Sequence, residues 1–113
     1  MEITYKQGIN EAKDLYFLTT SPSIHKLTEK SGQQIKIKKA VRYSDVMGGE
    51  IREAVAIMDA DGTVYASASP TFIRDFDRMV AIFAEYDEVV HTIEVVSGTS
   101  RNGRNYLTCK YID

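Results

Sequence analysis

Five segments typical of β-strands and one amphipathic helix follow one another in this chain, and their order limits the folds it can adopt. In the strand-like segments apolar and polar residues alternate, as they do in strands with one buried face. In the helical segment apolar residues recur every three or four positions and form one stripe. The first strand is predicted to run from Ile35 to the Gly48-Gly49 pair, the others to span residues 52–58, 63–69, 89–97 and 105–112, and the helix to open at Ser69-Pro70.

This order of three strands, a helix and two strands is that of the five-stranded OB barrel, whose helix lies between its third and fourth strands. The apolar stripe of the helix, which includes Phe72, Phe76 and Phe83, would close the bottom of the barrel. The alternative is an open sheet with one helix packed across it. We therefore expect a mainly β fold with one helix, an OB-like barrel formed by residues 35–113.

Residues 1–34 are predicted to form an N-terminal extension that is partly helical. Residues 12–19 contain a short apolar run that suits either a strand or a helix. A helix is expected to start at Ser21-Pro22, because serine is a common N-cap and proline suits the first helical position. Gly32 would end that helix.

The charge of the chain limits how it meets other molecules. The 113 residues carry a formal net charge of −2, which counts against indiscriminate binding to nucleic acid, where a basic domain is usual. A local basic patch is compatible with this total, because salt confines the influence of a charge to about 8 Å. No apolar run approaches the roughly 20 residues of a membrane span, and the first residues lack the pattern of a signal peptide. We expect a cytoplasmic protein without membrane contact.

Signals of an enzyme are weak. His25 and His91 are far apart in sequence and have no metal-ligand spacing with Cys109, the only cysteine. Cys109 lies within an apparent strand, which indicates a small buried core residue. Asp59 and Asp61 flank a turn, and turn chemistry explains both carboxylates. The sequence predicts no catalytic residue, no metal site and no cofactor.

Basic side chains gather along the first predicted strand. Lys36, Lys38 and Arg42 fall on the face opposite the apolar residues, and Lys39 interrupts the apolar row. Phosphates attract such a row of cations, and each neutralised phosphate releases counterions. A solubilising outer face or a protected sheet edge explains the same pattern. Both interpretations stay open at this point.

A polar hairpin is predicted between the last two strands. Asn102-Gly103 is a strong signal for a tight turn, because both residues tolerate positive φ. Arg101 and Arg104 flank this dipeptide. In an OB barrel this loop and the loop between the first two strands border the usual binding face. The two basic regions are therefore predicted to meet across that face.

Tyrosines on the predicted strands are candidates for stacking on flat ligands, and they are Tyr43, Tyr65 and Tyr106. Stacking of a base on such a ring contributes about 1–3 kcal/mol and needs no particular base. Alternatively, a tyrosine packs its ring in the barrel and leaves its hydroxyl at the surface. Tyr106 shares a face with polar residues and is the better stacking candidate, whereas Tyr111 shares a face with Cys109 and is expected in the core.

Two runs of the sequence carry a resemblance to a known family. Residues 60–69 combine an Asp-Gly hairpin with a Tyr-x-Ser strand, and residues 95–103 contain a Val-x-Gly-Thr-Ser segment before the last strand. With the helix between them, these runs resemble the single-stranded DNA-binding proteins of small tailed bacteriophages, especially those that replicate by protein priming. The resemblance covers residues 53–113. It implies an OB-type barrel that coats displaced strands during phage replication, without enzymatic activity.

By position, the resemblance carries the family's similar motifs onto Tyr65 and the loop from Gly98 to Arg104. Residues 1–34 have no counterpart in it. The last residues, 110–113, lack the acidic tail by which bacterial counterparts recruit other replication proteins. Contact with replication proteins is therefore expected elsewhere on the chain.

The sequence as a whole predicts a sequence-tolerant single-stranded DNA-binding protein that acts in the cytoplasm of a bacterial host. Because the total charge is acidic, we expect modest affinity per monomer, compensated by a homo-oligomer or by cooperative assembly along the strand. The alternative is a non-catalytic protein-interaction module of a phage or mobile element, and a small hydrolase or nuclease would need convergent carboxylates or histidines. The predicted DNA-binding residues are Lys36, Lys38, Lys39, Arg42, Tyr43, Tyr65, Arg101, Arg104 and Tyr106.

Overall fold

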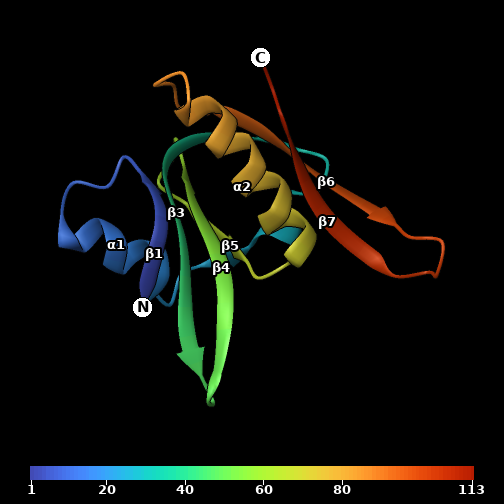
Figure 1. Cartoon of the computed structure of the whole chain (residues 1–113), viewed down its shortest axis with the longest axis horizontal. Coiled ribbons are helices and arrows are strands. Elements are labelled where there is room, and N and C mark those ends of the chain that lie inside the picture. Colours follow the sequence, from blue (N-terminus) through green and yellow to red (C-terminus); the bar gives the residue numbers. More distant parts are fainter.

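The computed structural model shows a strongly curled sheet with helix α2 packed against its hollow side (Figure 1). It describes the backbone of residues 1–113 and the side chains of all of them except Met47. The strands lie in the order β2-β5-β4-β3-β6-β7, and β1 pairs with β3 outside this path. The elements are β1 (Glu2–Gln7), α1 (Ala12–Thr19), β2 (His25–Lys26), the 3-10 helix η1 (Leu27–Lys30), β3 (Gln34–Met47), β4 (Glu50–Asp59), β5 (Val64–Ser67), α2 (Pro70–Ala84), β6 (Thr92–Thr99) and β7 (Asn105–Tyr111). No helix in the described part of the chain is long and apolar enough to cross a membrane.

Strand β3 joins the two halves of the sheet. Its first residues, Gln34–Lys36, pair with β6, and its remainder pairs with β4. A strand shared in this way curls the sheet into an OB-like half-barrel. Among the described residues β5 and β7 form no ladder with each other, and we call the gap between them the open seam. Across it the hydroxyls of Ser69 and Thr71 donate to the carbonyl oxygen of Leu107 at 3.4 and 2.6 Å.

The predicted order of three strands, a helix and two strands is confirmed by β3, β4, β5, α2, β6 and β7. The fold differs from a five-stranded barrel with one helix, because the N-terminal segment adds to it. β1 and β2 join the sheet by pairing with β3 and β5, and α1 is a second helix. The barrel also stays open at the seam, since β5 has only four residues and offers little edge for a ladder with β7.

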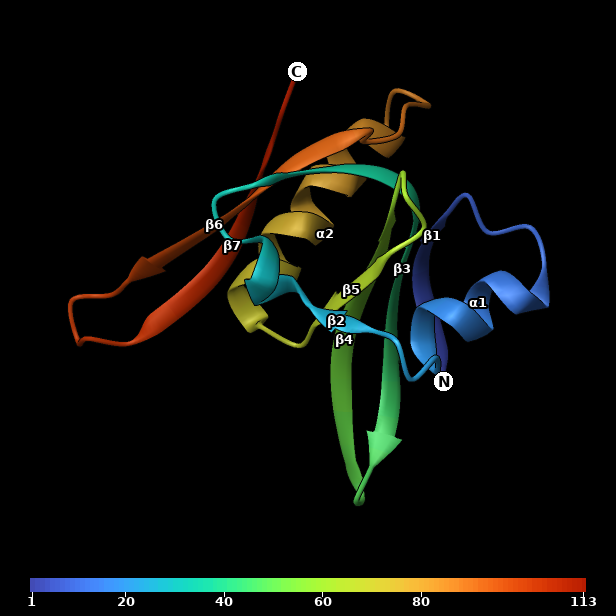
Figure 2. The same ribbon diagram turned by 180° about the vertical axis from the view of Figure 1, so that it is seen from behind.

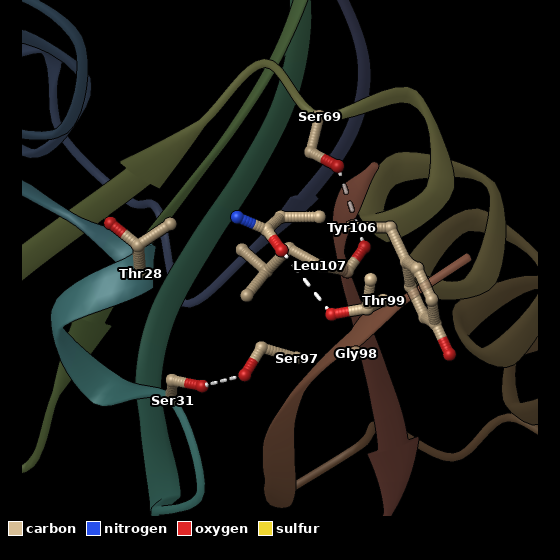
Figure 3. Close-up of a pocket in the computed structure, with 9 residues that line it drawn as sticks. Thr28, Ser31, Ser69, Ser97, Gly98, Thr99, Tyr106 and Leu107 are labelled. Atoms are coloured by element: carbon tan, nitrogen blue, oxygen red, sulfur yellow. Dashed lines mark hydrogen bonds between the residues drawn. The ribbon is translucent and has the colours of Figure 1, made fainter. Parts of the chain in front are cut away.

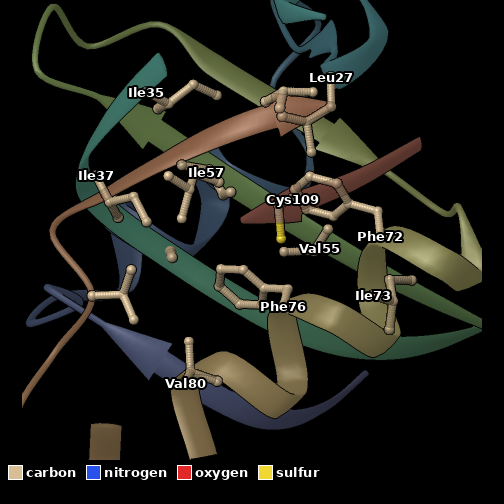
Figure 4. Close-up of a cluster of buried hydrophobic side chains, with 14 of the residues drawn as sticks. Leu27, Ile35, Ile37, Val55, Ile57, Phe72, Ile73, Phe76, Val80 and Cys109 are labelled. Carbon is tan, nitrogen blue, oxygen red and sulfur yellow. The ribbon is translucent and has the colours of Figure 1, made fainter. Parts of the chain in front are cut away.

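The helix predicted after Ser69 is confirmed as α2. The hydroxyl of Ser69 accepts a hydrogen bond from the backbone N–H of Phe72 at 3.5 Å, and Pro70 occupies the first turn, where no N–H is needed. The apolar stripe of α2 is buried against the sheet (Figure 4). The ring of Phe76 lies 6.0 Å from that of Tyr5 and 6.3 Å from that of Phe72. The α2 core consists of Leu27, Ile35, Ile37, Ala40, Val55, Ile57, Phe72, Ile73, Phe76, Val80, Val90, Ile93, Val95, Leu107 and Cys109.

The helix start predicted at Ser21 is wrong. The hydroxyl of Ser21 instead accepts a hydrogen bond from the N–H of Ser23 at 3.2 Å, so the same capping chemistry closes a turn that no helix follows. The helices of the N-terminal segment are α1, which begins after Glu11, and η1, which ends before Ser31. The apolar run of residues 12–19, expected as a strand or a helix, forms α1, whereas only the four residues of η1 are helical within the helix predicted between Ser21 and Gly32.

A bulge in β3 reverses its side-chain alternation. The pairing of β3 with β4 shifts between Ile37 and Lys39, and one extra residue moves every later side chain to the other face. Ile37 and Ala40 therefore both lie in the α2 core, whereas Val41 and Tyr43 belong to a second cluster. The prediction of one uninterrupted alternation, with Val41 and Tyr43 on the same face as Ile37, is wrong for this reason.

The turns of the first two hairpins follow from their residues. Gly48 and Gly49 have φ of 61° and 83°, which allows a two-residue turn between β3 and β4. As a result β4 begins at Glu50, two residues before the predicted start. In the next turn, Oδ1 of Asp59 accepts hydrogen bonds from the backbone N–H groups of Asp61 at 3.0 Å and Thr63 at 2.9 Å. The structural role predicted for the carboxylate of Asp59 is confirmed.

Candidate functional site

Helix α1 covers the face on which an OB barrel usually binds its ligand. That face belongs to the second and third barrel strands, which correspond here to β4 and β5. Leu18 of α1 is fully buried against Val41, Ala56 and Val64 in a cluster separate from the α2 core. The outer face of these strands is therefore largely covered around Leu18, which leaves little room there for a ligand.

An open groove lies along the open seam, between η1, the start of α2 and the hairpin formed by β6 and β7 (Figure 3). Its volume is about 640 Å³. Most of its lining residues carry a hydroxyl or amide group, and none of the described residues that line it carries a charge. Such groups suit the hydrogen bonds of bases and sugars better than they suit phosphates. We call it the hydroxyl groove, and its lining residues are Thr28, Ser31, Ser69, Ser97, Gly98, Thr99, Asn105, Tyr106 and Leu107.

The walls of the hydroxyl groove are held by contacts between distant segments. The N–H of Gly32 donates to the carbonyl of Val95 at 2.8 Å, and the N–H of Val95 donates to that of Gln33 at 2.9 Å. The hydroxyl of Ser31 donates to that of Ser97 next to these bonds. Together these contacts fix η1 against β6, so the groove is formed before any ligand binds.

The loop at the tip of the β6–β7 hairpin is one residue longer than the predicted tight turn. The N–H of Ser100 donates to the carbonyl of Arg104 at 2.8 Å, and the N–H of Gly103 donates back to Ser100 at 2.9 Å. These bonds enclose three residues, of which only Gly103 has positive φ, at 77°. Asn102 therefore does not adopt the left-handed conformation expected of it, because the three-residue loop requires it only at its last position.

Arg101 and Arg104 are both exposed on this hairpin loop. Neither takes part in an ion pair among the described residues. Their guanidinium groups are thus free to meet an anion without first breaking a contact within the protein.

Tyr106 extends from the outer face of the hairpin, as predicted, and borders the hydroxyl groove with its ring turned away from Thr28 and Ser31 (Figure 3). It faces Gly98 across the strands, and a Cβ atom at Gly98 would come within 2.5 Å of Cζ of the ring. The lack of a side chain at Gly98 therefore gives the ring its place. With 41% of its surface exposed, Tyr106 offers a ring face to a ligand.

The other face of β7 belongs largely to the core. Leu107 and Cys109 are buried, as predicted. Burial raises the pKa of the Cys109 thiol to about 12, with a smaller contribution from Asp75, so the thiol stays protonated at neutral pH. Tyr111 shares this face but is 43% exposed, with its ring 4.8 Å from that of Phe83. Tyr111 therefore lies at the margin of the core and not inside it.

Of the predicted basic cluster, Lys36 and Lys38 are exposed and Lys39 is not free. Nζ of Lys39 lies 2.5 Å from Oδ1 of Asp14, which is buried at the start of α1. The Lys39 ammonium and the N–H groups of Asn10 and Glu11 lower the pKa of Asp14 to about 2. The ion pair between Lys39 and Asp14 thus holds α1 against β3 at its bulge.

Arg42 is buried, and its prediction as part of an exposed basic face is wrong. Its guanidinium contacts both carboxylate oxygens of Asp77, at 2.7 and 3.1 Å, and Glu53 at 2.8 Å. It also donates to the carbonyls of Tyr43 and Ala54 at 3.2 and 3.0 Å. The bulge in β3 is the reason, because it turns Arg42 toward α2.

The two remaining tyrosine candidates are partly covered. Tyr43 packs beside α1, and burial raises its pKa, with a smaller effect of Asp45. Tyr65 lies between two neighbours, with Nζ of Lys30 5.5 Å from its ring centroid and the ring of His25 5.7 Å away. Neither ring is as open as that of Tyr106.

The two basic regions do not meet across one face. Lys36 pairs with Thr92 at the start of β6, whereas the hairpin loop follows Thr99 at its end. At about 3.3 Å per residue, the two points are roughly 23 Å apart along the strand. The prediction that the two basic regions adjoin is therefore wrong, because β3 pairs with the start of β6, whereas the hairpin loop follows its end.

Sequence reasoning did not find the hydroxyl groove. Its residues come from η1, the start of α2 and the last hairpin, and none of these segments has a pattern that marks its hydroxyls. Of its lining residues, only Tyr106 was predicted to bind a ligand, and Gly98 lies in the loop that the resemblance singled out. The described residues hold no group of three or more His, Cys, Asp or Glu side chains that could bind a metal ion.

Comparison with known proteins adds one finding. A family model described as phage single-stranded DNA-binding protein, of the Phi29 phage type, matches residues 11–111. The matched region contains α1, the hydroxyl groove and the whole β6–β7 hairpin. No curated protein and no solved structure matches the chain.

Proposed function

The chain belongs to the phage single-stranded DNA-binding protein family, and from this premise we propose that it coats exposed strands during phage DNA replication, without preference for sequence. Single-stranded DNA offers charged phosphates, flat bases that are free to stack and sugars with oxygen acceptors. A protein that coats it has to meet all of these without reading the order of the bases.

The β6–β7 hairpin is the observation that carries this proposal. Its tip holds two exposed arginines without ion pairs among the described residues, its outer face holds the exposed ring of Tyr106, and its inner face borders the hydroxyl groove. In our proposal Arg101 and Arg104 bind phosphates, Tyr106 stacks a base, and the groove accepts a base or sugar. Each contact is made with a part that all nucleotides share.

The other predicted residues contribute less to this proposal. Lys36 and Lys38 are exposed but lie at the other end of β6 from the hairpin loop, so they add positive charge to the surface without a contact in the proposed site. Lys39 and Arg42 already have carboxylate partners, and we assign them to the fold. With few free cations and a net charge of −2, one molecule binds weakly, so we expect neighbouring copies to bind side by side along the strand. We propose no catalytic step, and we place this action in the cytoplasm of the bacterial host.

A titration of fluorescent oligo-dT at several salt concentrations tests the proposal. The double variant Arg101→Ala plus Arg104→Ala should bind more weakly, and its plot of log affinity against log salt should be shallower by about 1.4, or about 0.7 for each phosphate that the variant no longer binds. Tyr106→Ala should weaken binding between about fivefold and a hundredfold with an unchanged slope, because it removes stacking and no charge.

Matched controls exist at the far end of α2. Arg78 and Tyr86 are both exposed and lie outside the hairpin, so Arg78→Ala and Tyr86→Ala should leave the affinity unchanged. If the unaltered protein does not bind oligo-dT at low salt, the proposed function is wrong. If it binds and the arginine variant equals Arg78→Ala, the function stands but the hairpin is not its site.

A further inference from the structure

A row of aromatic and basic side chains continues from the hydroxyl groove onto the N-terminal segment. Thr28 forms a wall of the groove, and Lys30, two residues later in η1, lies over the ring of Tyr65 at 5.5 Å. The other neighbour of Tyr65 is the ring of His25 in β2, at 5.7 Å. In Figure 2 the β6–β7 hairpin, η1, β2 and α1 follow one another across the side that faces the viewer.

A second groove begins where this row reaches β2. Its volume is about 450 Å³, and its lining includes His25, Ser21, Ser23 and Phe17 of α1. Since His25 both borders this groove and contacts Tyr65, the surface is continuous from the hydroxyl groove to α1. Hydroxyls again contribute to the lining, as they do in the first groove.

Helix α1 ends this path with two exposed aromatic rings. Tyr16 is 54% exposed and Phe17 is 49% exposed, and their ring centroids lie 5.6 Å apart at an angle of 77°. Neither ring is needed to anchor the helix, because Leu18 and Asp14 hold it to the sheet. Large exposed apolar side chains that gather in this way mark surfaces for binding.

The charges along the path favour stacking over phosphate binding. Lys26 and Lys30 bring positive charge without an ion pair among the described residues, but Glu29, Asp59 and Asp61 lie close by. The carboxylate of Glu29 accepts hydrogen bonds from the N–H of Lys26 and from the ring of His25. Both lower the pKa of Glu29, and the bond from Lys26 has the larger effect. Since three carboxylates outnumber the two ammonium groups here, a strand gains at this surface through its bases and not through its phosphates.

We propose that a DNA strand leaving the hydroxyl groove continues over η1 and β2 and stacks a base on Phe17, beside Tyr16. The N-terminal segment then has a binding role: it covers the usual OB face and offers a replacement surface beside the groove. This inference rests on the proposed single-stranded DNA binding and extends its site by several nucleotides.

The test compares two lengths of oligo-dT, one of about five nucleotides and one of about 16, within the range that one OB fold covers. The variant Tyr16→Ala plus Phe17→Ala should bind the long strand about tenfold more weakly or worse, with an unchanged salt slope, and should bind the short strand normally. The matched control is Ile82→Ala plus Tyr86→Ala, which removes two exposed side chains, 53% and 74% accessible, at the far end of α2.

A conservative variant gives an independent readout. The chain has no tryptophan, so Phe17→Trp introduces a unique fluorophore that still stacks. Its emission should be quenched by the long strand and not by the short one.

Normal binding of the long strand by the double variant, or an unquenched tryptophan, would overturn the inference while leaving the hairpin site intact. So would an equal loss for both lengths, since that points to an effect on the groove itself. Loss of self-association in sedimentation with intact DNA binding would assign the two rings to contact with a second copy. Failure of the unaltered protein to bind either strand would instead contradict the proposed function.

Discussion

The same side chain has different roles in this protein, depending on where the fold places it. The guanidinium of Arg42 is buried and bonded to Asp77 and Glu53, whereas that of Arg104 is exposed at the hairpin loop. A buried guanidinium has already exchanged its water for carboxylate and carbonyl oxygens, so a phosphate gains little by displacing them. Only exposed arginines without carboxylate partners are suited to bind the phosphates of a flexible DNA strand.

Lys39 and Asp14 give a prediction at this scale. The pKa of Asp14 falls from its usual 3.8 to about 2 in the folded protein, so the unfolded chain binds more protons between these values. The carboxylate therefore stabilises the fold above about pH 4, and this contribution is lost as the pH falls toward about 2.

Urea unfolding at a series of acidic pH values measures this effect. Asp14→Asn should be less stable than the unaltered protein at pH 7, and the difference should shrink as the pH falls. Glu2→Gln, at an exposed position, should run parallel to the unaltered protein. A difference between Asp14→Asn and the unaltered protein that stays constant with pH would contradict the assignment.

At the scale of elements, the β6–β7 hairpin presents different chemistry on its two faces because side chains alternate along a strand. Ser97 bonds to Ser31 and Leu107 lies in the α2 core, whereas their neighbours Gly98 and Tyr106 form the outer face, which also borders the hydroxyl groove. The same alternation predicted the orientation of Tyr106 from the sequence. It failed for Arg42, because the bulge in β3 inserts one residue ahead of it.

The end of α2 gives a prediction at this scale. Asp87 follows the helix with φ of 57° and is the only non-glycine residue with positive φ among the described residues. Its N–H donates to the carbonyl of Ala84 at 3.1 Å, and its side chain forms no hydrogen bond with the described residues that would compensate the strain. Asp87→Gly should therefore stabilise the protein by about 0.5–1 kcal/mol.

Thermal unfolding measures this change, which corresponds to a rise in Tm of a few degrees. The matched variant is Glu85→Gly, whose backbone has φ of −61°. Glu85→Gly should destabilise the protein by a similar amount. Its φ relieves no strain in the folded state, and glycine loses more conformational entropy on folding. Equal effects of the two substitutions would show that backbone strain at Asp87 is absent.

At the scale of the whole molecule, the N-terminal segment decides where a ligand has room. α1 covers the outer face of β3, β4 and β5, and β1 lengthens the sheet beside β3. The barrel stays open between β5 and β7, so the hydroxyl groove lies at this seam. An OB-like half-barrel thus retains loops that suit a nucleic acid while α1 covers most of its usual face.

The contact of Arg42 with Asp77 joins α2 to the middle of the sheet and gives a prediction at this scale. Asp77→Ala should destabilise the protein by about 1–3 kcal/mol, because it leaves a buried guanidinium short of partners. The cost stays at the lower end, since Glu53 and two carbonyls remain bonded to Arg42 and Asp77 is itself 44% exposed.

Chemical unfolding of Asp77→Ala checks this value against Asp75→Ala. Asp75 forms an ion pair with the exposed Arg74, and such pairs contribute less than about 1 kcal/mol. Equal stability of the two variants would mean that Arg42 does not depend on Asp77.

Most of the strands, α2 and the turns could be predicted from the sequence. The stripe of Phe72 and Phe76, the helix start at Ser69-Pro70 and the turn at Asp59 each depend on residues a few positions apart, and local patterns predict all three. The hairpin that carries Arg101 and Arg104 is predicted in the same way, although its loop is one residue longer. The roles of Lys39 and Arg42 and the hydroxyl groove could not be predicted.

The difference follows from the range of the interactions. Alternation, helical spacing, caps and turns act between neighbours, so the chain alone establishes the order of the elements and the hairpin with its two arginines. Contacts between distant residues decide the rest. Asp14 forms an ion pair with Lys39, Asp77 forms one with Arg42, and the hydroxyl of Ser31 donates to that of Ser97. The bulge in β3 and the packing of the N-terminal segment bring these partners together. No local sequence pattern predicts either of them. Which cations stay free, and where a strand of DNA has room to bind, are therefore decided only by the folded molecule.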